Sequence, residues 1–388
     1  MFLDGSHIIP VKVDDITWTL SAAVQQRVVN QREKMPAMIR GMVGHCFGYL
    51  VEEICTPTFS TAPTQVGLAA ALNRLTIKAE NSRVAIDLTG PDLRALEMYE
   101  NRGQIVSPEP DLNSASTNPF YSSRLALFAP PGYRGSPKDF VLPNFLLAAG
   151  SVEPNQAVKT DISADCTAGT VRRIVTALCV ALDRVRIGPK TEAKAFNAGG
   201  NVLELGERCL LSSLMLTEVL AHTTAFTAGD YSSFTLDDRK GNIYNGVDAA
   251  QLTRLFWAQN GTGQFGHIQG ELRAATDDNL KVVNGATPTA IASPGALYQP
   301  LVWPGNGASI NNVEPEGPFK LSWPGSVATG HFIARRIFPR SQQEAHELAT
   351  QVFQGLNLPY KGAAIRGAGR GPYVGPRPEY QAWDFLYR

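Results

Sequence analysis

Residues 72–101 read LNRLTIKAENSRVAIDLTGPDLRALEMYEN. Two short runs in this stretch, 74–79 and 83–88, place apolar side chains at every second position and are separated by a polar turn. A period of two predicts two adjacent strands, each with one buried face. A short helix is predicted next, because Asp92 can cap its free N–H groups and the leucines that follow share one face.

A similar unit occurs later in the chain. Residues 251–260, QLTRLFWAQN, resemble 92–101, DLRALEMYEN, and each segment follows a predicted strand that contains Leu and Asp. At nearly the same spacing, Val171-Arg-Arg-Ile174 corresponds to Ala334-Arg-Arg-Ile337. Two pairs of similar segments, each separated by about the same number of residues, indicate that the chain contains two copies of one domain.

The rest of the chain favours an all-β fold. Further strands are predicted at 171–182, 209–221, 234–236 and 331–338, whereas 103–165 and 260–318 are rich in Pro, Asn and Gly and are predicted to be long loops. Helices do not alternate with strands, which excludes a βαβ array. Short strands, few helices and long loops, all repeated once, predict two tandem jelly rolls.

The chain divides into four predicted parts. Residues 1–40 form an N-terminal helical arm, with a helix at 14–35 where Ile16, Leu20, Val24 and Val28 recur every four residues. Residues 41–189 form the first jelly roll and 190–340 the second. Residues 341–388 form a C-terminal helix (342–354) and an extended tail.

This architecture resembles the double-jelly-roll major capsid proteins of tailless, often membrane-containing bacteriophages and of adenovirus-like viruses. The likeness lies in the size, the predicted N-terminal helix, the paired units at 72–101 and 209–260, and the long loops. It implies a structural coat protein whose trimers make nearly hexagonal capsomers of an icosahedral virion shell. It also implies self-association, contact with penton or minor capsid proteins, and an internal membrane beneath some shells of this kind.

Composition agrees with a structural role. Lys+Arg and Asp+Glu are equal at 35 each, so a basic field for sequence-specific nucleic-acid binding is absent. Charged residues make up 18%, which suits a surface largely covered by neighbouring subunits. Neither a signal peptide nor an apolar run of transmembrane length is visible, so we expect synthesis in the host cytoplasm and location in the virion.

Motif analysis predicts no catalytic residue, cofactor or metal site, and hence no enzyme. Gly261-Thr-Gly-Gln-Phe-Gly266 has dinucleotide-fingerprint spacing but does not follow a strand, and we interpret it as a loop. None of the six histidines has metal-ligand spacing to another ligand. The five cysteines contain no C-x-x-C pair and are predicted to be buried free thiols. The histidines are His7, His45, His222, His267, His331 and His346, and the cysteines are Cys46, Cys55, Cys166, Cys179 and Cys209.

Two other functions stay open at this stage. One is a β-sandwich carbohydrate-active enzyme or binding module, whose cleft Trp257, Trp303 and Trp323 could line. The acidic pairs, for example Asp277-Asp278, could then supply carboxylates or bind calcium in a loop. The other is an elongated phage spike or fibre protein. The tail, with Arg and aromatic residues among Gly and Pro in 362–388, is predicted to dock on a neighbouring subunit.

Overall fold

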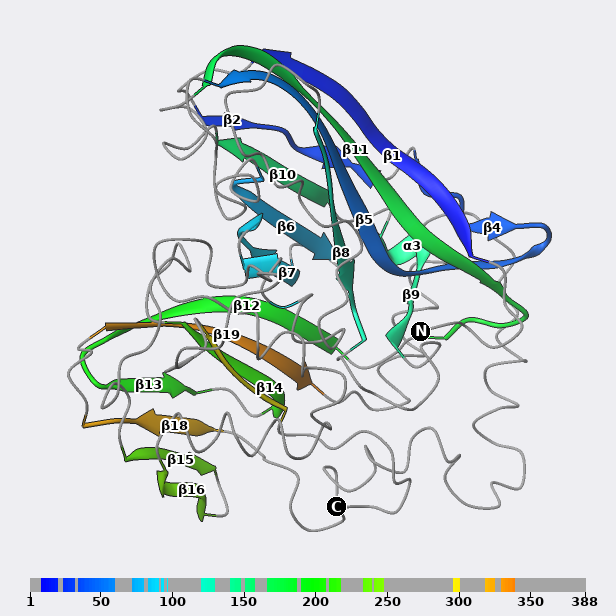
Figure 1. Cartoon of the computed structure of the whole chain (residues 1–388). Coiled ribbons are helices and arrows are strands. Elements are labelled where there is room, and N and C mark those ends of the chain that lie inside the picture. Colours follow the sequence, from blue (N-terminus) through cyan, green and yellow to red (C-terminus); the bar gives the residue numbers. More distant parts are fainter. Residues whose placement is uncertain are drawn as a thin grey trace, which may run out of the picture.

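In a computed structural model, the residues that the structure describes form strands almost exclusively (Figure 1). Within the described part of the chain, the one α-helix that is continuous from end to end is the one-turn α3 (Asn144–Leu147). The structure describes residues 8–19, 24–31, 34–59, 72–79, 83–90, 92–93, 96, 120–129, 140–147, 151–157, 166–186, 190–206, 209–217, 233–238, 241–247, 296–300, 318–324 and 329–338.

The first half of the chain folds into eight main strands in two sheets. Numbered along the chain, they pair in the order first, eighth, third, sixth in one sheet and second, seventh, fourth, fifth in the other. This order defines a jelly roll. The first sheet contains β1 (Ile9–Thr19), β11 (Cys166–Leu182), β5 (Met42–Phe59) and β8 (Phe120–Leu127), and the second contains β2 (Val24–Gln26), β10 (Ser151–Ala157), β6 (Arg74–Ala79) and β7 (Arg83–Leu88). Three short strands pair at their borders, β3 (Val29–Asn30), β4 (Met38–Ile39) and β9 (Leu142–Pro143).

The second half repeats this pairing order strand for strand. The prediction of two tandem jelly rolls is therefore confirmed by the strand order itself. One sheet contains β12 (Lys190–Gly199), β19 (Thr329–Phe338), β14 (Leu210–Thr217) and β17 (Ala296–Pro300), and the other contains β13 (Val202–Leu205), β18 (Phe319–Ser322), β15 (Phe234–Asp238) and β16 (Gly241–Val247). The first roll occupies the upper part of Figure 1 and the second the lower part.

The arginine-containing repeat identified in the sequence has a structural basis. Val171–Ile174 lies in β11 and Ala334–Ile337 lies in β19, and each is the eighth strand of its roll. Each is paired on one side with the first strand of its own roll and on the other side with the third. The other half of the repeat cannot be compared, because 251–260 lies outside the described residues.

The predicted N-terminal helix at 14–35 is wrong. Residues 9–19 are instead strand β1, antiparallel to β11 from Ile9 opposite Cys179 to Thr19 opposite Thr170. Asp14 does not cap a helix; its carboxylate accepts two 3.2 Å hydrogen bonds from Arg27. Residues 9–39 thus contribute β1 to β4 to the first roll rather than forming a separate arm.

The helix after β7 begins at a different residue from the one predicted. Thr89 is the N-cap, since its hydroxyl accepts from the backbone N–H of Asp92 at 3.2 Å. The Asp92 carboxylate accepts in return from the Thr89 N–H, also at 3.2 Å. This reciprocal capping box directs Leu93 and Leu96, both buried, toward the core. The predicted helices after Asp248 and at 342–354, and the tail, lie outside the described residues.

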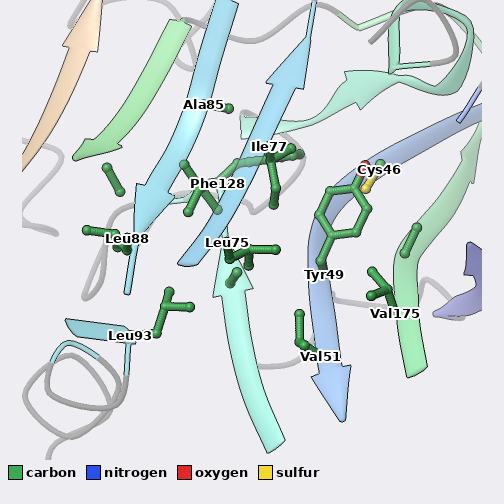
Figure 2. Close-up of a cluster of buried hydrophobic side chains, with 14 of the residues drawn as sticks. Cys46, Tyr49, Val51, Leu75, Ile77, Ala85, Leu88, Leu93, Phe128 and Val175 are labelled. Carbon is green, nitrogen blue, oxygen red and sulfur yellow. The ribbon is translucent and has the colours of Figure 1, made fainter. Parts of the chain in front are cut away.

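Each roll has its own apolar core, and one sheet is shared between them. The first core lies between the two sheets of roll 1, where Figure 2 shows Tyr49 and Val51 of β5 on one side and Leu75 of β6 on the other. The second core, around Phe234, Trp323 and Phe332, fills roll 2. Strand β12 pairs with β7, so that one nine-stranded sheet runs through both rolls.

Candidate functional site

The end of each roll that carries the long connections is the first candidate site. Because neighbouring strands within each roll are antiparallel, successive connections alternate between the two ends of a roll. The connections after the third and fifth main strands, 60–73 and 89–119, therefore leave the same end of roll 1. In roll 2 the equivalent connections, 218–233 and 248–295, likewise share one end. Long connections on a rigid β scaffold are where binding surfaces usually lie.

The pairing between the rolls gives both of them the same orientation. Strand β12 runs parallel to β7, with Ala193 opposite Ile86 and Lys194 opposite Asp87. β7 runs toward the connection 89–119, and β12 runs toward the end of roll 2 that carries 218–233 and 248–295. These four connections, which include the two longest of the chain, consequently start from the same side of the double roll.

A buried polar contact holds the two rolls together beside this ladder. His331 of β19 places Nε2 2.9 Å from the Oδ1 atom of Asp92, which follows β7 of roll 1. The other ring nitrogen, Nδ1, lies 2.7 Å from the Asn197 Oδ1 atom of β12. Arg335 adds a second link, since its Nη1 donates to the backbone carbonyl of Leu127 in β8 at 3.0 Å. Buried polar groups bonded in this way fix the relative position of the rolls.

Strand β19 is buried on both faces. Phe332 and Ala334 belong to the core of roll 2, whereas Ile333 and Ile337 belong to the core of roll 1, together with Ala193 of β12. Roll 1 thus completes its core with side chains from roll 2. The two rolls therefore behave as one body, because a shift of one roll against the other would expose apolar surface.

Each roll also contains a buried arginine at the equivalent position of its eighth strand. Arg173 of β11 is fully buried, donates to Glu53 of β5 from Nε at 2.8 Å, and stacks 5.1 Å from the ring centroid of Trp18 in β1. Arg336 of β19 donates to Glu192 at 2.7 Å and stacks 5.0 Å from Phe196 in β12. In both rolls the aromatic partner comes from the first strand, so this inner arrangement is duplicated along with the fold.

The described histidines have structural roles. His45 of β5 is fully buried, with Nδ1 2.9 Å from the Val43 carbonyl oxygen and Nε2 accepting from the Arg186 N–H at 2.9 Å. Burial lowers the pKa of His45 to about 4, and this effect outweighs the hydrogen bond to Val43, which acts in the opposite direction. The ring therefore stays neutral over the physiological range.

His45 makes the fold sensitive to acid. The unfolded chain binds a proton on this ring near pH 6.5, and the folded chain binds it only near pH 4. Stability is therefore lost as the pH falls from 6.5 through 4, by roughly 3 kcal/mol at most. His45→Gln should flatten this part of the pH dependence, which urea denaturation at a series of pH values measures. Parallel curves for the two proteins over that range would contradict the assignment.

The other candidate residues from the sequence are buried in a core, bound in an ion pair, or outside the described part of the chain. Trp323 is 2% exposed and packs 5.2 Å from the ring centroid of Phe332, so it cannot line a sugar-binding cleft. Glu53 is bound to Arg173, and no group of three or more His, Cys, Asp or Glu side chains able to hold a metal occurs among the described residues. Residues 261–266, Asp277-Asp278, Trp257 and Trp303 lie outside the described part, as do His7, His222, His267 and His346. No described helix is long and apolar enough to span a membrane.

Sequence reasoning missed the contacts between the rolls. The sequence pattern predicts Asp92 only as a helix cap, and His331 is only a histidine without metal-ligand spacing. They lie 239 residues apart, and no local pattern connects them. The available signal was weak: each is a polar residue next to a strongly apolar segment, where a buried partner is required.

Comparison with known proteins finds similarity in structure rather than in sequence. Neither a family model nor a curated protein sequence matches the chain. Among solved structures, the major capsid protein P2 from bacteriophage PM2 is 10% identical with a TM-score of 0.48, and the match covers 86% of this chain and 98% of that one. The STIV MCP is also 10% identical with a TM-score of 0.48, covering 84% and 97%. VP54 of PBCV-1 is 7% identical with a TM-score of 0.45, covering 84% and 94%.

Proposed function

We propose that this chain is a viral major coat protein that assembles as trimers into an icosahedral shell. The observation that carries the proposal is the duplicated jelly roll with both copies in the same orientation. Two rolls of one design in each chain, repeated by a threefold axis, give six nearly equivalent edges. Such a trimer is a pseudo-hexagonal tile that can cover a closed surface.

The ends of the double roll suit the two sides of a shell. Four connections, 60–73, 89–119, 218–233 and 248–295, leave one side, which we assign to the outside of the virion because it carries the two longest connections, 89–119 and 248–295. The opposite side carries the short connections 80–82, 206–209 and 239–240 together with 128–150 and 301–318, and we assign it to the inner surface. The strands then stand upright between the two surfaces and form the wall.

Composition supports the same role. With Lys+Arg and Asp+Glu equal at 35 each, the chain lacks the net positive charge that binds a genome non-specifically. The partners that we propose are further copies of itself, penton or minor capsid proteins and, in some shells, a membrane below. The role is non-enzymatic, and the protein is made in the host cytoplasm before it enters the virion.

The trimer is tested by mass. Native mass spectrometry or light scattering on the purified protein should give three times the chain mass of 41.9 kDa at micromolar concentration. A threefold assembly is expected because a single chain presents only two of the six edges of the tile. A monomer at all concentrations, or a dimer, would contradict the proposal.

The tail gives a second test. Deleting residues 362–388 should leave the fold intact but weaken assembly, because a segment rich in Gly, Pro and Arg cannot form a core and can only add contacts between subunits. Circular dichroism checks the fold, and the trimer dissociation constant checks assembly. A truncated chain that assembles as tightly as the full chain would contradict a docking role for the tail.

A further inference from the structure

Two buried cysteines of the first core lie directly opposite each other. Cys46 of β5 and Cys179 of β11 are cross-strand partners in the antiparallel ladder, and both are fully buried free thiols. Directly opposed residues in an antiparallel pair have Cα atoms about 4.5–5.5 Å apart. That separation lies within the range that a disulfide spans, about 4.4–6.8 Å.

A bulge in β5 brings these thiols together. The register shifts between Leu178, which lies opposite Gly48, and Cys179, which lies opposite Cys46. Phe47 is the extra residue and joins a separate apolar cluster with Val180, while Cys46 lies in the first core with Cys179. Strict alternation from the core residue Tyr49 would instead have directed Phe47 inward.

The bulge is fixed by close packing. A Cβ atom at Gly48 would lie 2.6 Å from the Ala126 carbonyl oxygen and 2.8 Å from a methyl group of Leu127, so only glycine fits there. Next to it, the Tyr49 ring meets Phe128 edge-on at 6.1 Å, and its hydroxyl bonds to Gln31. Figure 2 shows Cys46 beside Tyr49 on β5. The backbone that positions the Cys46 thiol is therefore rigid.

We propose that Cys46 and Cys179 form a disulfide across β5 and β11 when the protein meets a low-molecular-weight disulfide. One thiol loses its proton and attacks that disulfide, which releases one small thiol and leaves a mixed disulfide on the protein. The second thiolate attacks the mixed disulfide, which releases the second small thiol and closes the protein bond. Two protein thiols are oxidised to one disulfide, and one small disulfide is reduced to two thiols.

The local chemistry determines how fast this happens. Burial raises the pKa of the Cys46 thiol well above its usual value, and the adjacent Cys179 thiol raises it further. Few thiolates form in the closed fold, so oxidation is slow until the core opens. Once the disulfide has formed and the core has closed around it, burial also protects the bond from reduction. Closure costs two weak hydrogen bonds, from Cys46 Sγ to the Gly48 carbonyl oxygen at 3.2 Å and from Cys179 Sγ to Asn144 Oδ1 at 3.7 Å.

The consequence is a covalent clamp on the third and eighth strands of roll 1. The bond would close a chain segment from 46 to 179, which contains most of the first roll. A long closed segment restricts the unfolded chain strongly, so the oxidised protein should unfold roughly 5–10 °C above the reduced one. This inference does not depend on the proposed coat function.

The test is direct mapping of the bond. The full-length protein is incubated with oxidised glutathione, both folded and during refolding from denaturant, then alkylated in denaturant and digested without reductant. Mass spectrometry should find a peptide pair joining Cys46 to Cys179, together with a raised unfolding midpoint that dithiothreitol reverses. Cys46→Ala and Cys179→Ala should abolish both effects. Cys209→Ala, which removes a cysteine buried in the other core, should keep both effects.

Two results would overturn the inference. One is complete alkylation of both thiols after the folded and the refolding incubations. The other is a joined peptide without a raised midpoint, since a strained bond would not act as a clamp.

Discussion

Replacing Arg173 with Met is expected to lower the free energy of unfolding by about 3–5 kcal/mol. The guanidinium is fully buried between the sheets of roll 1 and donates to the Glu53 carboxylate, which is itself buried. Removal of the arginine leaves a buried carboxylate without this charge partner, and burial of such a charge is costly. The midpoint of urea denaturation, followed by tryptophan fluorescence, measures the change.

The neighbouring residue supplies a matched control. Arg172 lies on the opposite face of β11 and forms an exposed pair with Asp15, at 2.8 Å from Nε to Oδ1. Arg172→Met removes the same charge from an exposed pair that water and salt already screen, so it should change stability far less than Arg173→Met. The double variant Arg173→Met with Glu53→Leu should recover part of the loss, because both buried charges are then gone. Equal effects of the two single arginine substitutions would show that burial of Arg173 is not what matters.

Cutting the chain between the rolls is expected to leave one cooperative unit, whereas removing roll 2 should destroy the fold of roll 1. Residues 1–186 alone would lose Ala193, Ile333 and Ile337 from their core and would leave β7 as an unpaired strand edge. Exposed apolar surface and open edges lead to aggregation. We therefore expect the isolated segment to be insoluble or to show no cooperative thermal transition in circular dichroism.

A nicked protein separates the effect of the cut from the effect of the loss. A protease site inserted between β11 and β12 cuts the connection but keeps both rolls. The cut halves should elute together in size-exclusion chromatography and unfold in a single transition, since β7–β12 pairing and the His331–Asp92 contact remain. Two separate transitions, or a stable and monodisperse isolated roll 1, would contradict the shared core.

The strands of the fold follow closely from sequence pattern where alternation is strict. The runs at 74–79, 83–88 and 331–338 predict β6, β7 and most of β19, because each must bury one or both faces. The 14–35 segment shows why the same reasoning fails nearby. Apolar residues spaced four apart satisfy a helix, but four is also an even number, so they equally share one face of a strand. Pairing with the long strand β11, far along the chain, decides the outcome.

The buried polar contacts could not be predicted from local sequence pattern. The Arg-Arg pairs at 172–173 and 335–336 revealed the repeat, but their partners were not predictable, since Glu53 lies 120 residues before Arg173. The bulge that aligns Cys46 with Cys179 depends likewise on the approach of β8 to Gly48. Alternation identifies which side chains turn inward, but only the paired sheets determine which of them meet.

Negative-stain electron microscopy of the purified full-length protein, with two-dimensional class averages, tests the coat-protein proposal most directly. We expect compact particles with threefold symmetry and a hexagonal outline, in which six similar densities represent the two rolls of three chains. Elongated trimers, or particles of single-chain size at every concentration examined, would contradict it.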